Sequence, residues 1–185
     1  KINYLKKKLN KPNANLVLFS DDNFNLNLSK NFLSSTEYTY IKDLLKNYDL
    51  KKNLFIFEIS SKKKIILISI KNNFKTSDFE GLGAKFYECI KNSKHKEYFI
   101  YSDSISKKYE NFLGYFLHGI KLKSYNFKKY KSKKDNKEFF INIVGAKNIP
   151  SAQNQLKFKA LEEGTFLTRD LVSEPGNVLH PDEYA

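Results

Sequence analysis

The residues that could perform chemistry are scattered along this sequence and do not form a catalytic pattern. The three histidines, His95, His118 and His180, show no H-E-x-x-H or other metal-ligand spacing, so we interpret each as a surface or helix residue. The carboxylate pairs Glu162-Glu163 and Asp182-Glu183 would point apart on a helix. Neighbouring carboxylates of that kind do not converge on one ion, so these residues predict no metal centre.

Three other candidates favour structural roles. The run Ser102-Asp103-Ser104 is explained by a loop or a helix cap. Cys89 has no basic cluster or paired histidine to activate it, so we expect a small buried thiol in a helix. Gly81-Leu82-Gly83 lacks the third glycine of a dinucleotide fingerprint. Phosphate-loop and nucleophile-elbow motifs are also absent from the sequence. We therefore predict no catalytic, cofactor-binding or metal-ligating residue in this chain.

The formal net charge of +13 makes nucleic acid a partner to consider. Arg169 is the sole arginine, and the lysines are spread from end to end. Lys, Asn, Ile and Tyr are all abundant, as happens when codons are rich in A and T. We interpret the charge as a solvated lysine surface. A working basic patch is the alternative, although no arginine cluster offers bidentate contacts to bases or phosphates.

The chain length, the apolar runs and the cysteine content constrain the size of the fold and the cellular compartment. The 185 residues suffice for one domain with a proper core. No apolar run approaches the ~20 residues of a membrane span, and residues 1–11 do not resemble a secretory signal. A single cysteine excludes an internal disulfide and fits a reducing compartment. We expect a cytoplasmic protein with no membrane partner. Because the sequence has no Met and opens with Lys1, we expect it to be a fragment of a longer chain.

Short apolar or aromatic runs bounded by polar residues predict buried strands. The expected strands are 15–20, 54–59, 65–70, 97–101 and 138–144, with 2–5 as a further candidate. Residues 60–64 are the simplest hairpin connection. Such a hairpin would make the sheet mixed, because the other strands alternate with helices.

Three segments show the periodicity of amphipathic helices. The first has Ser77 or Asp78 as its N-cap. Its apolar face consists of Phe79, Leu82, Phe86 and Ile90. The second spans 106–122, where Gly114 and Gly119 allow close packing. The third spans 151–173 and is stopped by residues 174–176, Glu-Pro-Gly. We predict an α/β domain in which a mixed β-sheet is flanked by helices.

Two longer segments carry a recognisable pattern. Residues 168–181, TRDLVSEPGNVLHP, follow [AT]-R-[DN]-L-x-N-x-P-x-N-x-x-x-P, except that Ser173 stands where asparagine is usual. Residues 116–131, FLHGIKLKSYNFKKYK, follow G-x-x-L-x-x-Y-x-F-x-x-Y-K, in a polar loop that Tyr125, Phe127 and Tyr130 could anchor. Both patterns resemble those of the leucyl aminopeptidases. The resemblance covers about the whole chain, strongly from Leu113 onward and loosely before it.

The resemblance implies a division of the chain and an activity for a longer parent protein. Residues 1–150 would form the macro-domain-like amino-terminal α/β domain, residues 151–173 the connector helix, and residues 174–185 the start of a truncated catalytic domain. In this family two divalent ions, zinc or manganese, bind the free amino end of a peptide and activate a water molecule. Their ligands lie in the carboxyl-terminal domain, which this chain lacks. We therefore expect the chain alone to be inactive.

The resemblance also implies partners. These are the chain's own carboxyl-terminal catalytic domain and further copies of the parent, which would form a homo-oligomer, expected to be a hexamer. The apolar residues of the connector helix spread over more than one face, as expected if part of it packs on a missing domain. They are Leu156, Ala160, Leu161, Phe166, Leu167 and Leu171. The carboxyl-terminal half of this helix should therefore be exposed here.

Two alternatives belong to other functional classes. A macro-type module that binds a small molecule such as ADP-ribose would need a glycine-rich loop beside a strand end, and Gly145 with Ala146 is the sole candidate. A lysine-rich DNA-binding domain is the second alternative, since some members of the family bind DNA. Its affinity would be weakly specific and steeply salt-dependent.

Overall fold

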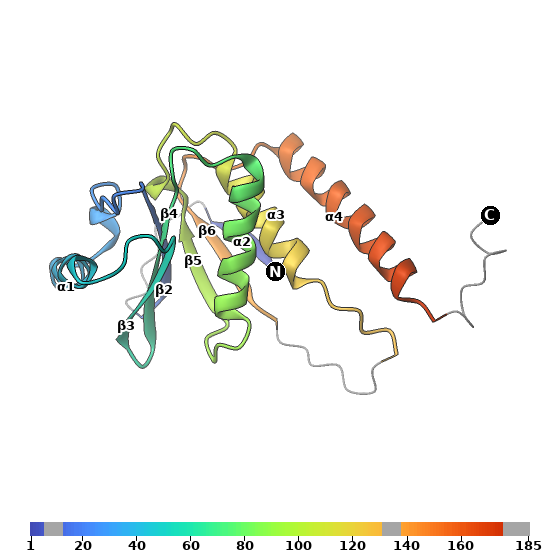
Figure 1. Cartoon of the computed structure of the whole chain (residues 1–185), viewed down its shortest axis with the longest axis horizontal. Helices are drawn as coiled ribbons and strands as arrows, with labels where there is room; N and C mark the ends of the chain where they lie inside the picture. Colours follow the sequence, from blue (N-terminus) through green and yellow to red (C-terminus); the bar gives the residue numbers. More distant parts are fainter. Residues whose placement is uncertain (6–12, 131–137, 176–185) are drawn as a thin grey trace.

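The computed structural model describes residues 1–5, 13–130 and 138–175 as a layered α/β fold (Figure 1). Across the single sheet the strands are β1 (Ile2–Leu5), β6 (Phe140–Val144), β5 (Glu97–Tyr101), β2 (Asn15–Ser20), β4 (Lys63–Ser69) and β3 (Leu54–Ser60). The helices are α1 (Ser35–Lys46), α2 (Thr76–Ile90), α3 (Phe112–Ser124) and α4 (Ala152–Ser173), with short 3-10 turns η1 (Lys30–Phe32) and η2 (Ser102–Ser104). Over these ranges, no helix has the length and apolarity needed to cross a membrane.

The mixed sheet predicted from the sequence is confirmed. Strands β1, β6, β5, β2 and β4 run parallel, and β3 pairs antiparallel with β4 through the expected hairpin. The central strand β2 reads NLVLFS and is buried at every position, as parallel strands covered on both faces are. Its first residue, Asn15, donates to the Glu97 carbonyl and accepts from the Lys64 amide, each at 3.0 Å. This side chain therefore joins the starts of three neighbouring strands.

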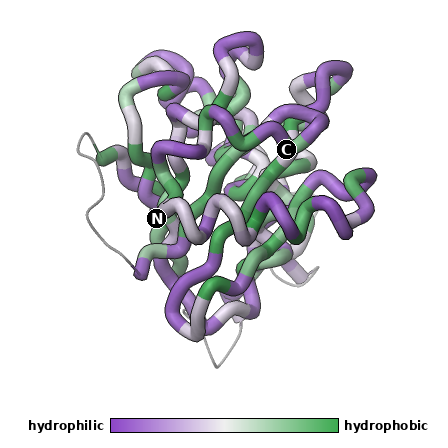
Figure 2. The backbone as a smooth tube through the Cα atoms, turned by 90° about the vertical axis from the view of Figure 1, so that its left-hand side faces the viewer, coloured by the Kyte–Doolittle hydropathy of each residue, from purple (hydrophilic) through white to green (hydrophobic). Residues whose placement is uncertain are grey.

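Two hydrophobic cores lie on opposite faces of the sheet. Val17 and Phe19 of β2 point into the core shared with α2 and α3, whereas Leu16 and Leu18 point into the core beneath α1. This alternation follows from the two-residue period of a strand. In Figure 2 the hydrophobic stretches run through the sheet, and much of the peripheral tube is hydrophilic. Helix α4 lies outside both cores, beyond α3 (Figure 1).

Helices α2 and α3 cross at two glycines. The predicted inner face of α2, Phe79, Leu82, Phe86 and Ile90, is buried against the sheet and α3. A Cβ atom built on Gly83 would lie 2.0 Å from the Phe116 carbonyl oxygen, and one on Gly119 would lie 2.0 Å from the Glu80 carbonyl oxygen. Only glycine permits backbones to approach this closely. The crossing sets the position of α3 and of everything that packs on it.

Three expectations for this layer were wrong. Helix α2 begins at Thr76 with Lys75 as its N-cap, and not with Ser77 or Asp78. The second helix begins at Phe112 and not at Ser106, because Asn111 adopts a left-handed backbone (φ 56°) that interrupts any helix running through it. The preceding turn is held by Tyr109, whose hydroxyl donates to the Ile70 carbonyl at 2.7 Å. Cys89, expected to be buried, is exposed. Partial desolvation and the neighbouring Glu88 raise the pKa of its thiol, so it has no thiolate activation.

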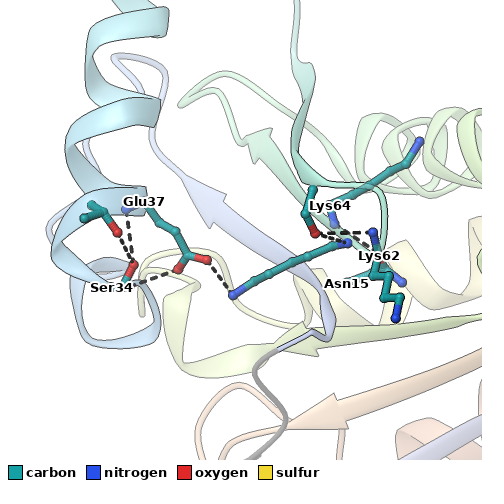
Figure 3. A network of polar contacts seen from close by, with 8 residues as sticks. Asn15, Ser34, Glu37, Lys62 and Lys64 are labelled. Carbon is teal, nitrogen blue, oxygen red and sulfur yellow. Dashed lines mark hydrogen bonds and ion pairs between the residues drawn. The ribbon is translucent and has the colours of Figure 1, made fainter.

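Helix α1 was not predicted from the sequence, although it carries a capping box. The Ser34 hydroxyl accepts from the Glu37 amide at 3.2 Å, and the Glu37 carboxylate accepts from the Ser34 amide at 3.0 Å (Figure 3). The same carboxylate pairs with the Lys63 ammonium at 2.5 Å, where both side chains are nearly enclosed. Burial alone would raise the pKa of Glu37, but the bonds from Lys63 and Ser34 hold it below its usual value. This pair ties α1 to the first residue of β4.

The helix crossing predicts opposite effects for two neighbouring glycines. Gly83→Ala should destabilise the chain by about 2–3 kcal/mol, because its methyl group meets backbone that cannot move aside. Gly81→Ala is the matched control, since nothing lies within 4 Å of its added Cβ and alanine favours the helix by up to about 1 kcal/mol. Urea unfolding of both variants measures the difference. Equal stability of the two variants would contradict the crossing.

The Glu37 pair predicts a loss of stability in acid. Because the folded pKa lies below the usual 4.5, its stabilisation is present above that value and is lost as the pH falls through the folded pKa. Glu37→Gln should cost roughly 1.5–3 kcal/mol at neutral pH and little once the carboxylate is protonated. Glu58→Gln, which breaks the exposed pair with Lys64, should change the stability much less. A pH-independent cost at Glu37 would show that its charge contributes nothing.

Candidate interdomain surface on the last helix

The inner face of α4 packs on α3 through one aromatic residue. Phe158 is the buried side chain of α4, and its ring lies against Gly114, where an added Cβ would lie 2.5 Å from it. The ring also meets Tyr115 edge-on, with centroids 5.0 Å apart, and lies 5.2 Å from the His118 ring. Gly114 was expected to allow close packing, whereas Phe158 was missed as its partner. The amino-terminal half of α4 is therefore fixed on this domain.

One turn further along, His118 and Glu162 join the same two helices. The His118 Nδ1 lies 3.3 Å from a Glu162 carboxylate oxygen, and both side chains are largely buried. Burial raises the pKa of Glu162, although the bond to His118 opposes this shift. Glu163 points elsewhere and pairs with the exposed Lys159. The two adjacent carboxylates thus diverge, and Glu162 has a packing partner in His118.

The carboxyl-terminal half of α4 is held by the loop after α3. The Arg169 guanidinium donates to the Leu122 carbonyl at 2.7 Å and lies over the Tyr125 ring, 5.4 Å from its centroid. The Tyr125 hydroxyl donates to Asp170 at 2.7 Å. Lys129 pairs with Glu174 at 2.6 Å, and Tyr130 donates to the same carboxylate. These contacts join the two segments that carry the family pattern, 116–130 and 168–175.

The outer face of α4 carries an exposed apolar stripe. With 3.6 residues per turn, Leu156, Ala160, Leu167 and Leu171 fall within about 60° of one another, on the side opposite Phe158. Leu156 and Leu167 are 68% and 61% exposed. Leu161 and Val172 add further exposed apolar surface on one flank. Exposed apolar residues gathered on one side of a helix make this side a candidate interaction surface. The carboxyl-terminal half of α4 was expected to be exposed. This expectation holds for the outer side of that half but not for its inner side.

The serine-rich run and the glycine at the carboxyl edge of the sheet are structural. Asp103 of η2 accepts from the Ala146 and Lys147 amides at 3.0 and 2.8 Å. The Gly145 backbone adopts a φ of 133°, and a Cβ there would lie 2.4 Å from the Ser102 hydroxyl. A phosphate cradle at this loop would need those two amides, which the Asp103 carboxylate already occupies. This arrangement weighs against the macro-type alternative.

The remaining candidates form no centre. His95 lies before β5, partly exposed, and its amide donates to the Ser93 hydroxyl. Gly81 and Gly83 lie inside α2, and Gly83 serves the helix crossing. His180 and the pair Asp182-Glu183 fall outside the described residues. Across the described ranges, no group of three or more His, Cys, Asp or Glu side chains could hold a metal ion.

Curated relatives of the chain carry the name probable cytosol aminopeptidase. The chain is 39% identical to the one from Clostridium perfringens over 104 residues, which cover 52% of this chain and 21% of that protein. It is 39% identical to the one from Phytoplasma mali over 75 residues, covering 37% and 15% respectively. The match thus spans about a fifth or less of these relatives. No protein-family model matches the chain.

Solved structures share the fold over more of the chain. A mutant of tomato leucine aminopeptidase superposes on all of this chain and on 40% of its own length, with a TM-score of 0.70 and 14% identity. The bottromycin maturation enzyme BotP covers 92% of this chain and 35% of its own, with a TM-score of 0.62 and 13% identity. The part matched in the leucine aminopeptidase is its amino-terminal region.

The two sequence segments, their contact in space and these comparisons agree. The chain is similar to the amino-terminal portion of proteins named cytosol aminopeptidase, and its fold is that of the matched region of a leucine aminopeptidase.

Proposed function

We propose that this chain is the non-catalytic amino-terminal domain of a two-metal leucyl aminopeptidase, which removes amino-terminal residues from peptides. The observation that carries the proposal is the contact between segments 116–130 and 168–175, the same two segments in which the family pattern is found. The matched part is about a fifth of the length of these relatives, and the proposal assigns the catalytic function to a carboxyl-terminal portion of the parent.

Within the described ranges, the chemically competent candidates have a structural partner or an ordinary surface setting. His118 meets Glu162, Asp103 accepts two backbone amides, and Cys89 has a raised pKa. In the parent, two divalent ions would supply a Lewis acid and an activated water for peptide cleavage. The related enzyme BotP is described in complex with Mn. The residues holding such ions are expected in the parent's carboxyl-terminal domain and not among those described here.

Helix α4 supports the proposed connector role. Its inner face is bonded to this domain from Phe158 to Glu174, which fixes the direction in which the chain leaves. Its outer stripe is apolar and exposed, as expected for a surface that a following domain covers. We therefore assign residues 1–150 to the domain, 151–173 to the connector and 174–185 to the start of the catalytic domain. The parent would be a cytosolic homo-oligomer, by resemblance a hexamer.

The outer stripe offers a direct test in the parent protein. The double variant Leu156→Ser and Leu167→Ser should reduce hydrolysis of leucyl p-nitroanilide with added manganese by about tenfold or more, because a buried apolar contact between domains is lost. Leu50→Ser, at a 40% exposed leucine between α1 and β3, is the matched control and should leave activity unchanged. The 185-residue chain alone should show no turnover.

Two results would overturn the proposal. One is hydrolysis that remains with the purified chain through successive columns. The other is a parent whose activity and thermal stability are unaffected by the two serines on the stripe.

The contacts of Arg169 give a second prediction. Arg169→Gln removes a charge-assisted bond to the Leu122 carbonyl and the stacking on Tyr125. Hydrogen exchange of amides 166–173 in the chain should accelerate about tenfold, whereas amides of β2 and β6 should not change. Lys157→Gln, at an exposed position on the same helix, is the control. Unchanged exchange in the Arg169 variant would mean that Phe158 alone holds the helix.

A further inference from the structure

The carboxyl edge of the sheet contains a crevice that the proposed function does not use. Strands β2 and β5 are neighbours in the sheet. The chain that leaves β2 crosses to β3 and β4 on one side of this pair, whereas the chain that leaves β5 crosses to β6 on the other side. Their loops diverge above the neighbouring ends of β2 and β5, since α1 covers one face and α3 the other. Open α/β sheets bind small ligands at such a reversal of strand order.

A cavity of about 170 Å³ lies at this point. It is lined by Ser20, the last residue of β2, by Asp21, Asn25 and Leu28 from the loop that follows, and by Ser106 and Lys108 after β5. The volume is below the ~300 Å³ of drug-sized pockets and equals that of about six water molecules. The cavity therefore suits a molecule no larger than a single amino acid or a small sugar.

Ser20 presents a buried hydroxyl that the fold leaves unpaired. This serine is 6% exposed, and its Oγ has no hydrogen-bond partner in the described chain. The other buried serines of the described ranges are all satisfied: Ser29, Ser69, Ser102 and Ser104 each donate to a backbone carbonyl. An unsatisfied buried hydroxyl costs stability, and in native structures it calls for an explanation. A ligand group at this position would supply the missing partner.

The cavity wall carries one charge of each sign. One oxygen of Asp21 accepts from the Asn23 and Asn25 amides, at 3.1 and 2.9 Å, and the other oxygen has no partner within the described ranges. The Lys108 ammonium contacts the Asn72 side-chain oxygen but no carboxylate of the described chain. A phosphate would be repelled by Asp21, and a simple cation by Lys108. The wall is therefore complementary to a zwitterion.

We propose that this crevice binds a free α-amino acid with an apolar side chain. Its ammonium would pair with Asp21, its carboxylate would accept from Ser20 and Lys108, and its side chain would lie on Leu28. Charge-assisted bonds at both ends make such a ligand preferable to a neutral sugar of the same size. The proposal goes beyond the proposed function and does not require it, because all the residues involved lie in this chain.

The test is a calorimetric titration of the 185-residue chain with L-leucine. Saturable binding is expected below about 10 mM. Leucinamide, which lacks the carboxylate, and 4-methylpentanoate, which lacks the ammonium, should each bind about tenfold more weakly. Asp21→Asn keeps the bonds to the Asn23 and Asn25 amides but should abolish the preference for leucine over 4-methylpentanoate. Lys108→Gln should likewise abolish the preference over leucinamide.

Ser20→Ala gives an independent readout of folding. It should weaken leucine binding about tenfold and leave the melting temperature of the free chain equal or higher, because an unsatisfied hydroxyl is removed. Ser61→Ala, at an exposed turn, should change neither quantity. The proposal fails if leucine does not bind, if ribose or phosphate binds in its place, or if binding is insensitive to Ser20. A lower melting temperature for Ser20→Ala would show that the hydroxyl is satisfied without a ligand, which also counts against it.

Discussion

The close crossing of α2 and α3 is the constraint on which the rest of this structure depends. At Gly83 and Gly119 the helices approach until backbone meets backbone, and Phe112 and Phe116 of α3 then contact Phe19 of β2, with ring centroids 5.1 and 5.4 Å apart. With α3 held at this depth, its opposite side presents Gly114 and His118 to α4. The sheet thus positions α3, and α3 in turn positions α4.

Under the proposed function, this hierarchy gives the domain a positioning role in the parent enzyme. The loop 125–130 follows α3 and runs along the carboxyl end of α4, where Arg169 and Glu174 contact it. The direction of α4 is therefore fixed by bonds at both of its ends. A following domain attached to such a helix would be held in a defined orientation relative to this one. The exposed leucines provide the apolar surface against which it would pack.

Much of the fold could be predicted from the sequence, because hydrophobic periodicity reports burial directly. The strands, the hairpin and the inner face of α2 were all predicted in this way. Helix α1 was missed although its sequence is amphipathic, with Ile41 and Leu45 on the buried face, and although the Ser34 and Glu37 capping box was a readable signal. The start of α3 was placed too early because no periodicity reveals the left-handed backbone of Asn111.

The candidate surface was predictable only in part. The spacing of its apolar residues predicted exposure of the carboxyl-terminal half of α4 but not the division into an outer and an inner side. Tyr125 was correctly expected to anchor the loop. Phe158 was not distinguished from the other apolar residues of α4, since only the tertiary contact with Gly114 selects it. The unpaired hydroxyl of Ser20 could not be predicted at all, because it depends on which groups the fold brings near it.

The central claim is that the outer face of α4 is covered in the parent and bare in this chain. The most direct measurement is the thiol-labelling rate of Leu167→Cys in both proteins, followed by mass spectrometry, with the exposed Cys89 as internal reference. We predict that position 167 labels about as fast as Cys89 in the chain and about tenfold or more slowly in the parent. Equal labelling of position 167 in the two proteins would contradict the account.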